Sequence, residues 1–141
     1  MIVVASAFMA FVSVADDAKV KEALKNPLIK KWRDSLDPGS AWAAGKKSAS
    51  NLDKLKWCTL ARMTEWTKNE YPSMKEADKY LGKEFRELFS SITDEKEQKN
   101  YLVWQQRIGQ VAVAVSKTRL SGIAAWKKIC DLMIENGLLP K

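Results

Sequence analysis

Apolar residues recur along this chain at intervals of three and four, and no stretch shows the sustained alternation of a half-buried β-strand. One such pattern covers residues 52–71. Its apolar stripe consists of Leu52, Leu55, Thr59, Met63 and Trp66. Ser50 or Asn51 can cap the start of this segment, and Pro72 stops it. The spacing predicts a long amphipathic helix here.

The most regular pattern starts at a capping residue near position 94 and continues to about residue 120. Its stripe consists of Tyr101, Trp104, Ile108, Val111 and Val115. Val103, Val113 and Ala114 add apolar surface outside that stripe. Because a helix that is apolar on several sides is usually surrounded by others, we expect this helix to be the central one.

Further helices are predicted from start and stop residues. Pro27 suits a first helical position, and Ser73 with Glu76 forms a capping box. Gly137 suits a left-handed stop, with Leu138 folding back as its hydrophobic contact. These residues and the apolar spacing predict helices over 17–24, 27–36, 73–91 and 123–136.

Residues 37–51 are rich in Ser, Ala and Gly and show no periodicity, so we expect one long irregular connection there. The complete pattern predicts an all-α fold. Its architecture is expected to be an up-and-down bundle of about five amphipathic helices. Residues 16–141 are long enough for a single domain with a core.

Residues 1–15 carry no charge and are nearly all apolar or small. At about 1.5 Å per residue they are too short to cross an apolar layer roughly 30 Å thick. Ser13 and Ala15 place small residues where a signal peptidase reads the chain. A signal-like segment and a secreted protein are therefore predicted. A buried N-terminal helix and a membrane-inserting segment are the alternatives.

The chain carries 24 Lys and Arg against 17 Asp and Glu, a net charge of +7, so we expect an anionic partner. It contains no histidine, which removes Ser-His-Asp and Cys-His sites and the usual zinc and haem ligands. Cys58 and Cys130 form either one disulfide or two buried thiols. No cofactor, metal site or catalytic residue is predicted, and we expect no enzyme activity.

Nucleic acid is not an expected partner. The chain has only five arginines, and no predicted helix carries a dense basic stripe for a phosphate backbone. Most acids lie on helix faces three or four residues from a lysine, as Glu76 does with Lys79, where they support the helix.

Trp57 lies away from the apolar stripe of its helix. Its neighbours on the helical wheel include Lys54 and Lys68. An indole beside lysines suits a membrane–water interface, because lysine stems can lie along apolar surface while their charges stay in water. The alternative is that Trp57 packs against a neighbouring helix or against residues 37–51.

Two other segments combine apolar and basic residues. The 37–51 segment holds Trp42 with Lys46 and Lys47, and the alternative to a contact site there is a loop that Trp42 fixes to the body. The last helix places Ile129 and Leu132 outside its main stripe near Lys128. The residues expected to contact a membrane or a partner are Trp42, Lys46, Lys47, Lys54, Trp57, Lys68, Lys128, Ile129 and Leu132.

Two stretches resemble the abalone sperm acrosomal proteins, which comprise lysin and its fusagenic paralogue. They are SASNLDKLKWCTLARMTEWTKNEY (Ser48–Tyr71) and ENGLLPK (Glu135–Lys141). The resemblance implies a five-helix bundle stored in the acrosomal vesicle, with no catalytic residue. In the paralogue it implies membrane activity in sperm–egg fusion. In lysin it implies non-enzymatic loosening of the egg envelope through basic tracks and a dimer surface.

The surface is richer in acids than the lysin pattern and lacks its dense arginine tracks. We therefore expect a secreted cationic protein that binds and perturbs the egg plasma membrane or another anionic lipid surface. The alternative is a lysin-like protein that loosens the egg vitelline envelope by binding a coat glycoprotein. A homodimer is compatible with either function.

Overall fold

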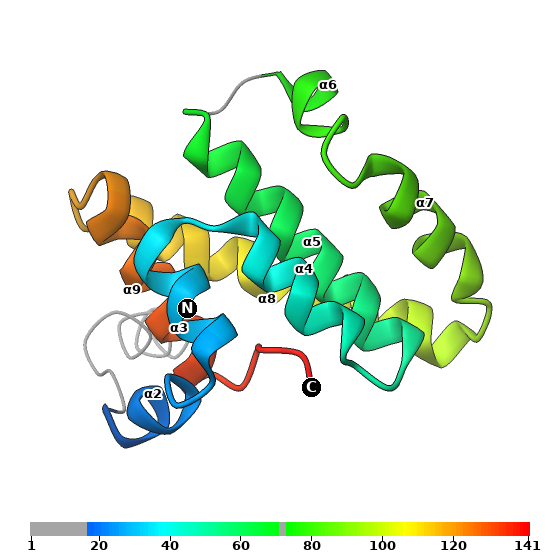
Figure 1. Ribbon diagram of the computed structural model, residues 1–141, viewed down its shortest axis with the longest axis horizontal. Coiled ribbons are helices and arrows are strands. Elements are labelled where there is room, and N and C mark those ends of the chain that lie inside the picture. Colours follow the sequence, from blue (N-terminus) through cyan, green and yellow to red (C-terminus); the bar gives the residue numbers. More distant parts are fainter. Residues whose placement is uncertain (1–16, 71–72) are drawn as a thin grey trace, which may run out of the picture.

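The computed structural model describes residues 17–70 and 73–141, and this part of the chain is helical without a strand. The predicted all-α class is confirmed. The signal-like segment 1–15 and the Pro72 stop lie outside the described residues. In chain order the helices are α2 (Asp17–Ala23), α3 (Pro27–Ser35), α4 (Pro38–Lys46), α5 (Asn51–Lys68), α6 (Met74–Ala77), α7 (Gly82–Ser91), α8 (Glu95–Ser116) and α9 (Gly122–Glu135) (Figure 1).

Residues with capping side chains mark several helix boundaries, as the sequence predicts. Asn26, Ser50 and Asp94 each accept a hydrogen bond from a backbone amide in the first turn of α3, α5 and α8. After α9, Gly137 has a φ of 66°, and the amide of Leu138 donates 2.8 Å to the carbonyl five residues earlier. Leu138 is buried, so this stop also fixes the C-terminal residues against the body.

The irregular connection predicted over residues 37–51 is wrong, because this segment contains α4. The side chain of Asp37 accepts a 3.0 Å hydrogen bond from the amide of Gly39, and Pro38 occupies the first helical position. This is the arrangement that also starts α3. Small residues then let α4 lie close to α5.

The continuous helix predicted over residues 73–91 is also wrong, because the chain breaks between α6 and α7. Leu81 has a left-handed backbone with a φ of 56°. The next residue, Gly82, is buried, and a Cβ on it would lie 3.3 Å from a carboxylate oxygen of Asp78. The break sets the direction of α7, whose Phe85 and Leu88 pack on the core beside α5.

Among the described helices α5 contacts the most others, and the expectation that α8 is central is wrong. Helices α4, α6, α7 and α8 all contact α5. One side of α8 is buried through Tyr101, Trp104 and Ile108, whereas Leu102 and Val113 on its other side are 58% and 51% exposed. Of the extra apolar residues predicted on α8, Val103 and Val113 therefore face solvent, whereas Ala114 is fully buried.

Three indoles form the centre of the core. The ring of Trp32 lies edge-on to Trp57 and Trp126, with centroids 6.1 Å and 5.4 Å away. Trp126 donates its Nε1 hydrogen to the carbonyl of Trp32 at 3.1 Å. Edge-to-face rings with paired N–H groups bury large apolar area without leaving a polar atom unbonded.

Candidate functional site

Trp57 is buried, with 3% of its surface exposed. It lies beneath α4, where a Cβ on Gly45 would be 2.7 Å from the Cβ of Trp57 and 3.7 Å from the ring of Trp42. Its Nε1 donates to the carbonyl of Lys141 at 3.4 Å. The prediction that Trp57 contacts a membrane is therefore wrong, because α4 covers the side of α5 that carries it.

The residues on the last helix that were expected to contact a membrane or a partner are also partly or fully buried. Leu132 is fully buried, and Ile129 and Lys128 are partly buried. Helices α2, α3 and α8 all contact α9, so more of its circumference is covered than a single stripe suggests. The prediction of Leu132 as a contact residue is wrong.

The remaining predicted residues do not form one site. Lys46 lies over the ring of Trp42, with its Nζ 5.7 Å from the centroid, and Lys47 is exposed beside it. Lys54 and Lys68 lie near opposite ends of α5, the first partly buried and the second exposed. The structure thus brings together only the group at the end of α4.

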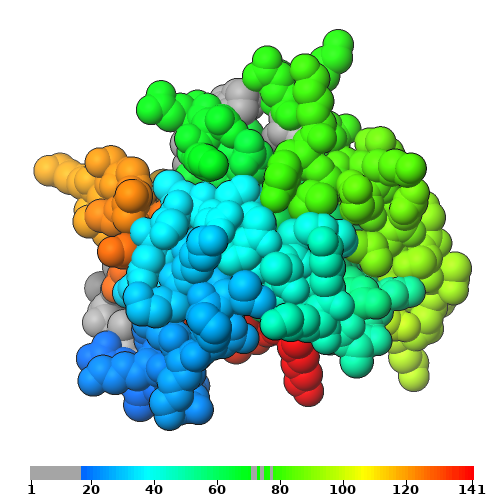
Figure 2. All heavy atoms as spheres, viewed as in Figure 1, coloured from blue at the N-terminus to red at the C-terminus, as the bar shows by residue number. Residues whose placement is uncertain are grey.

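A different surface carries the exposed apolar side chains. It covers the outer side of α8 and the connection to α9, and we call it the α8 face. Its large apolar residues, which are 43% to 58% exposed, are Leu102, Val103, Val113, Leu120 and Ile123. The part around residue 120, coloured orange, projects from the body in Figures 1 and 2.

Negative charge near the α8 face is confined to its edges, at Glu95 and Glu97 in the first turn of α8 and at Glu70, which lines a cleft with Leu120. From Gln98 to Cys130 the chain contains six Lys or Arg and no Asp or Glu. In a chain with 17 acids this is a long gap, and the sequence alone shows that the C-terminal part is basic. A surface that combines exposed apolar groups with cations suits the interface of an anionic membrane.

One flank of α8 is a basic hollow of about 440 Å³. Its charged and amide residues are Lys56, Lys96, Lys99, Arg107 and Asn100. Lys56 donates to Asn100 Oδ1 at 2.8 Å, with its Nζ 5.7 Å from the centroid of the Trp104 ring. Burial lowers the pKa of Lys56. A bound anion would relieve the repulsion among these four cations, because opposite charge nearby favours their charged forms.

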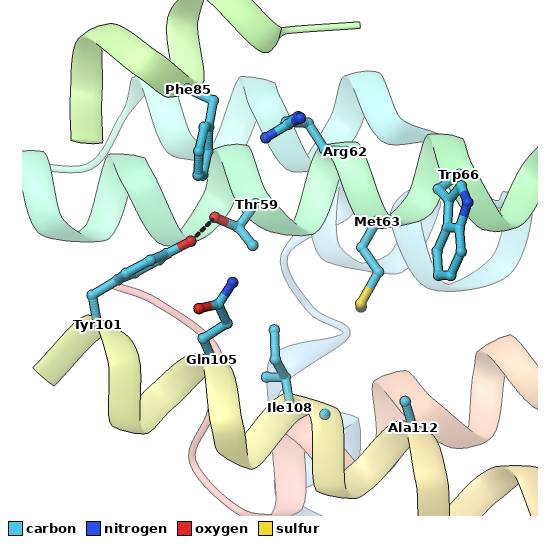
Figure 3. A pocket seen from close by; sticks show the side chains of 10 residues that line it. Thr59, Arg62, Met63, Trp66, Phe85, Tyr101, Gln105, Ile108 and Ala112 are labelled. Atoms are coloured by element: carbon cyan, nitrogen blue, oxygen red, sulfur yellow. Dashed lines mark hydrogen bonds between the residues drawn. The ribbon is translucent and has the colours of Figure 1, made fainter. Parts of the chain in front are cut away.

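The other flank of α8 is an apolar cleft of about 350 Å³ between α5, α7 and α8 (Figure 3). Side chains from α5 and α7 point toward α8 across it. Its apolar lining includes Met63, Trp66, Phe85, Ile108 and Ala112. At one end the hydroxyls of Thr59 and Tyr101 share a hydrogen bond of 2.9 Å, and Gln105 and Arg62 lie beside them.

No catalytic or metal-binding arrangement is evident around α8. The clefts that flank this helix lack a pair of carboxylates in their linings. Within residues 17–70 and 73–141, no group of three or more Cys, Asp or Glu lies close enough to hold a metal ion. Cys58 and Cys130 are buried as separate thiols, and burial raises the pKa of Cys58 to about 12.

Comparisons of the chain with protein-family models, with curated proteins and with solved structures give no match in any of the three. Over the part of the chain that the structure describes, no helix has the length and apolar character needed to span a bilayer.

Proposed function

We propose that this protein is secreted and binds and perturbs anionic membranes through its α8 face, in the manner of a fusagenic sperm protein acting on the egg plasma membrane. The observation that carries the proposal is the set of exposed apolar residues on a segment, residues 98–130, that contains no Asp or Glu. The likeness of residues 48–71 and 135–141 to the acrosomal proteins supports storage in the acrosomal vesicle.

The energetics of the α8 face favour membrane contact. Inserting one leucine or isoleucine side chain into an apolar phase contributes about 1.5–3 kcal/mol. Each lysine or arginine close to an anionic bilayer adds about 1 kcal/mol. Leu120 and Ile123 lie on the projecting corner between α8 and α9, and Lys117 and Arg119 stand next to them in the chain. A few such groups acting together are enough to hold a protein of 15.9 kDa at an interface.

The test is leakage and lipid mixing of vesicles that contain phosphatidylserine, measured at low salt. Leu120→Asn combined with Ile123→Asn should weaken vesicle binding by tenfold or more, about 1.4 kcal/mol or above. Phe89→Asn is the matched control, because Phe89 is 51% exposed on α7 and lies outside the α8 face. Vesicles that stay intact with the unmodified protein at low salt would refute the proposal.

A lysin-like binding protein is the second candidate, and the basic hollow beside α8 favours it. Four cations without a lining carboxylate also suit the acidic or sulfated glycans of an egg-coat glycoprotein. Such a protein loosens the vitelline envelope without turnover. Dissolution of isolated envelopes that follows protein dose and not incubation time would support this function. We also propose a homodimer, which is compatible with either function.

We propose that the scaffold for either activity is an up-and-down bundle of about five amphipathic helices. In this proposal α3, α5, α7, α8 and α9 are its members. The shorter α2, α4 and α6 are additions to that scaffold.

A further inference from the structure

We infer that the cleft between α5, α7 and α8 binds one single-chain amphiphile, with its hydrocarbon chain in the cleft and an anionic carboxylate or phosphate at Arg62. This site goes beyond the proposed membrane contact, because it takes one ligand molecule and needs no bilayer. The cleft and the α8 face lie on different sides of the same helix.

The hydrocarbon part of the cleft has the size and lining of a ligand site. Its volume of about 350 Å³ is within the range of about 300–1,000 Å³ that is common for small-molecule pockets. Met63, Phe85 and Ile108 supply apolar walls from three helices (Figure 3). A Cβ on Gly109 would meet no heavy atom within 4 Å, so the lining is open there.

The polar end of the cleft is lined by one charged residue, Arg62. Arg62 and Arg86 both bond to the one carboxylate of Asp78, Arg86 at 3.4 Å. The guanidinium of Arg62 lies over the ring of Phe85, 4.4 Å from its centroid. Its Nε is buried and has no hydrogen-bond partner among the described residues. An anionic oxygen at this N–H would form a charge-assisted bond to a donor that has already lost its water.

A second cleft of about 490 Å³ adjoins the first at Ala112. It continues between α8 and α9, where Val115 and Ile129 line it together with Glu70 and with Leu120, the one lining residue that also belongs to the α8 face. A longer hydrocarbon chain can therefore extend from the first cleft into the second. The affinity should rise about fourfold for each added methylene group while the chain still lies inside the clefts.

Calorimetric titration with sodium decanoate and decyl phosphate, below their micelle concentrations, tests the inference. We expect saturable binding at one site. Gly109→Leu should reduce the affinity at least tenfold, because the new side chain fills the cleft. Gln106→Leu is the matched control, since Gln106 is exposed on α8 and does not line the cleft. Equal affinity of the two variants, or binding that does not saturate, would overturn the inference.

A second variant tests the position of the headgroup. Arg62→Met should remove the preference for decanoate and decyl phosphate over neutral decanol, and circular dichroism checks that it folds. If decanol binds as tightly as the two anions to the unmodified protein, the assignment of Arg62 is wrong. If Arg62→Met does not fold, the comparison of Gly109→Leu with Gln106→Leu still decides whether the cleft is a site. Vesicle leakage is a separate measurement, so its absence would refute the membrane proposal alone.

Discussion

Trp32 donates a hydrogen bond of 2.7 Å from its Nε1 to the hydroxyl of Thr64, and both side chains are fully buried. This bond connects α3 to α5. The Thr64 hydroxyl donates in turn to the carbonyl of Leu60 at 2.6 Å. Thr64 stands on the side of α5 that carries Trp57 and Ala61, away from the predicted apolar stripe. Its bond to Trp32 shows that α5 is a core helix on this side also.

Removing the acceptor at Thr64 should destabilise the protein. In Thr64→Val the indole N–H of Trp32 keeps its place in the core without a partner, which costs about 1–3 kcal/mol. Urea unfolding measures this loss. Thr67→Val is the control, because among the described residues the Thr67 hydroxyl bonds only to the Met63 carbonyl of its own helix, at 2.9 Å. Equal stability of Thr64→Val and the unmodified protein would contradict the role of this bond.

Replacing glycine by alanine should change the stability of the protein in opposite directions at two helical positions. One is Gly45, at the contact between α4 and α5, and the other is Gly109, on α8. Gly45→Ala would place a Cβ 2.7 Å from the Cβ of Trp57, so the helices must separate at a cost of about 1–3 kcal/mol. Gly109→Ala meets nothing within 4 Å and should stabilise α8 by about 0.5–1 kcal/mol. Thermal unfolding of the two variants measures both. A stabilising Gly45→Ala would disprove the close packing of α4.

The two cysteines should be unreactive in the folded protein. Burial raises the pKa of Cys58 to about 12 and that of Cys130 well above its ordinary value. The reactive thiolate is therefore scarce at pH 8, and both sulfurs are shielded from reagents. We expect a disulfide reagent to label neither thiol in native protein and both in urea. Rapid labelling before unfolding would show that the structure around these cysteines opens.

Acid should weaken the fold partly through Asp34. The pKa of this carboxyl is lowered by a 2.6 Å hydrogen bond from Lys30, against a smaller effect of burial, and by a further bond from Arg33. Because the folded pKa lies below the unfolded value of about 3.9, the stabilisation is present above that pH. It is lost as the pH falls toward the folded pKa.

Asp34→Asn should therefore lower the melting temperature near neutral pH and reduce its decline on acidification. Melting curves at several values between about pH 6 and pH 2 measure this difference. Lys25→Gln is the control, because Lys25 pairs with the equally exposed Glu22, at 2.7 Å. A decline that is identical in Asp34→Asn and in the unmodified protein would show that another carboxyl is responsible.

The sequence by itself determined the helical class and the ends of most helices. Apolar residues three and four positions apart define the buried side of α8. Local side chains such as those of Ser50 and Asp94 cap their helices. The same local rule applies at Asp37 and Pro38, which start α4 within the segment predicted to be irregular. These features are predictable because they depend on neighbours within a few residues.

Only the tertiary structure decided which surfaces are covered. A helical wheel shows which residues share a side, but not whether another helix packs there. Trp57 is buried because Gly45 lets α4 approach, and Leu102 is exposed because the helices that contact α8 leave that side open. Burial depends on contacts between residues far apart in the chain, and for this reason the candidate surface lies on α8 and not around Trp57.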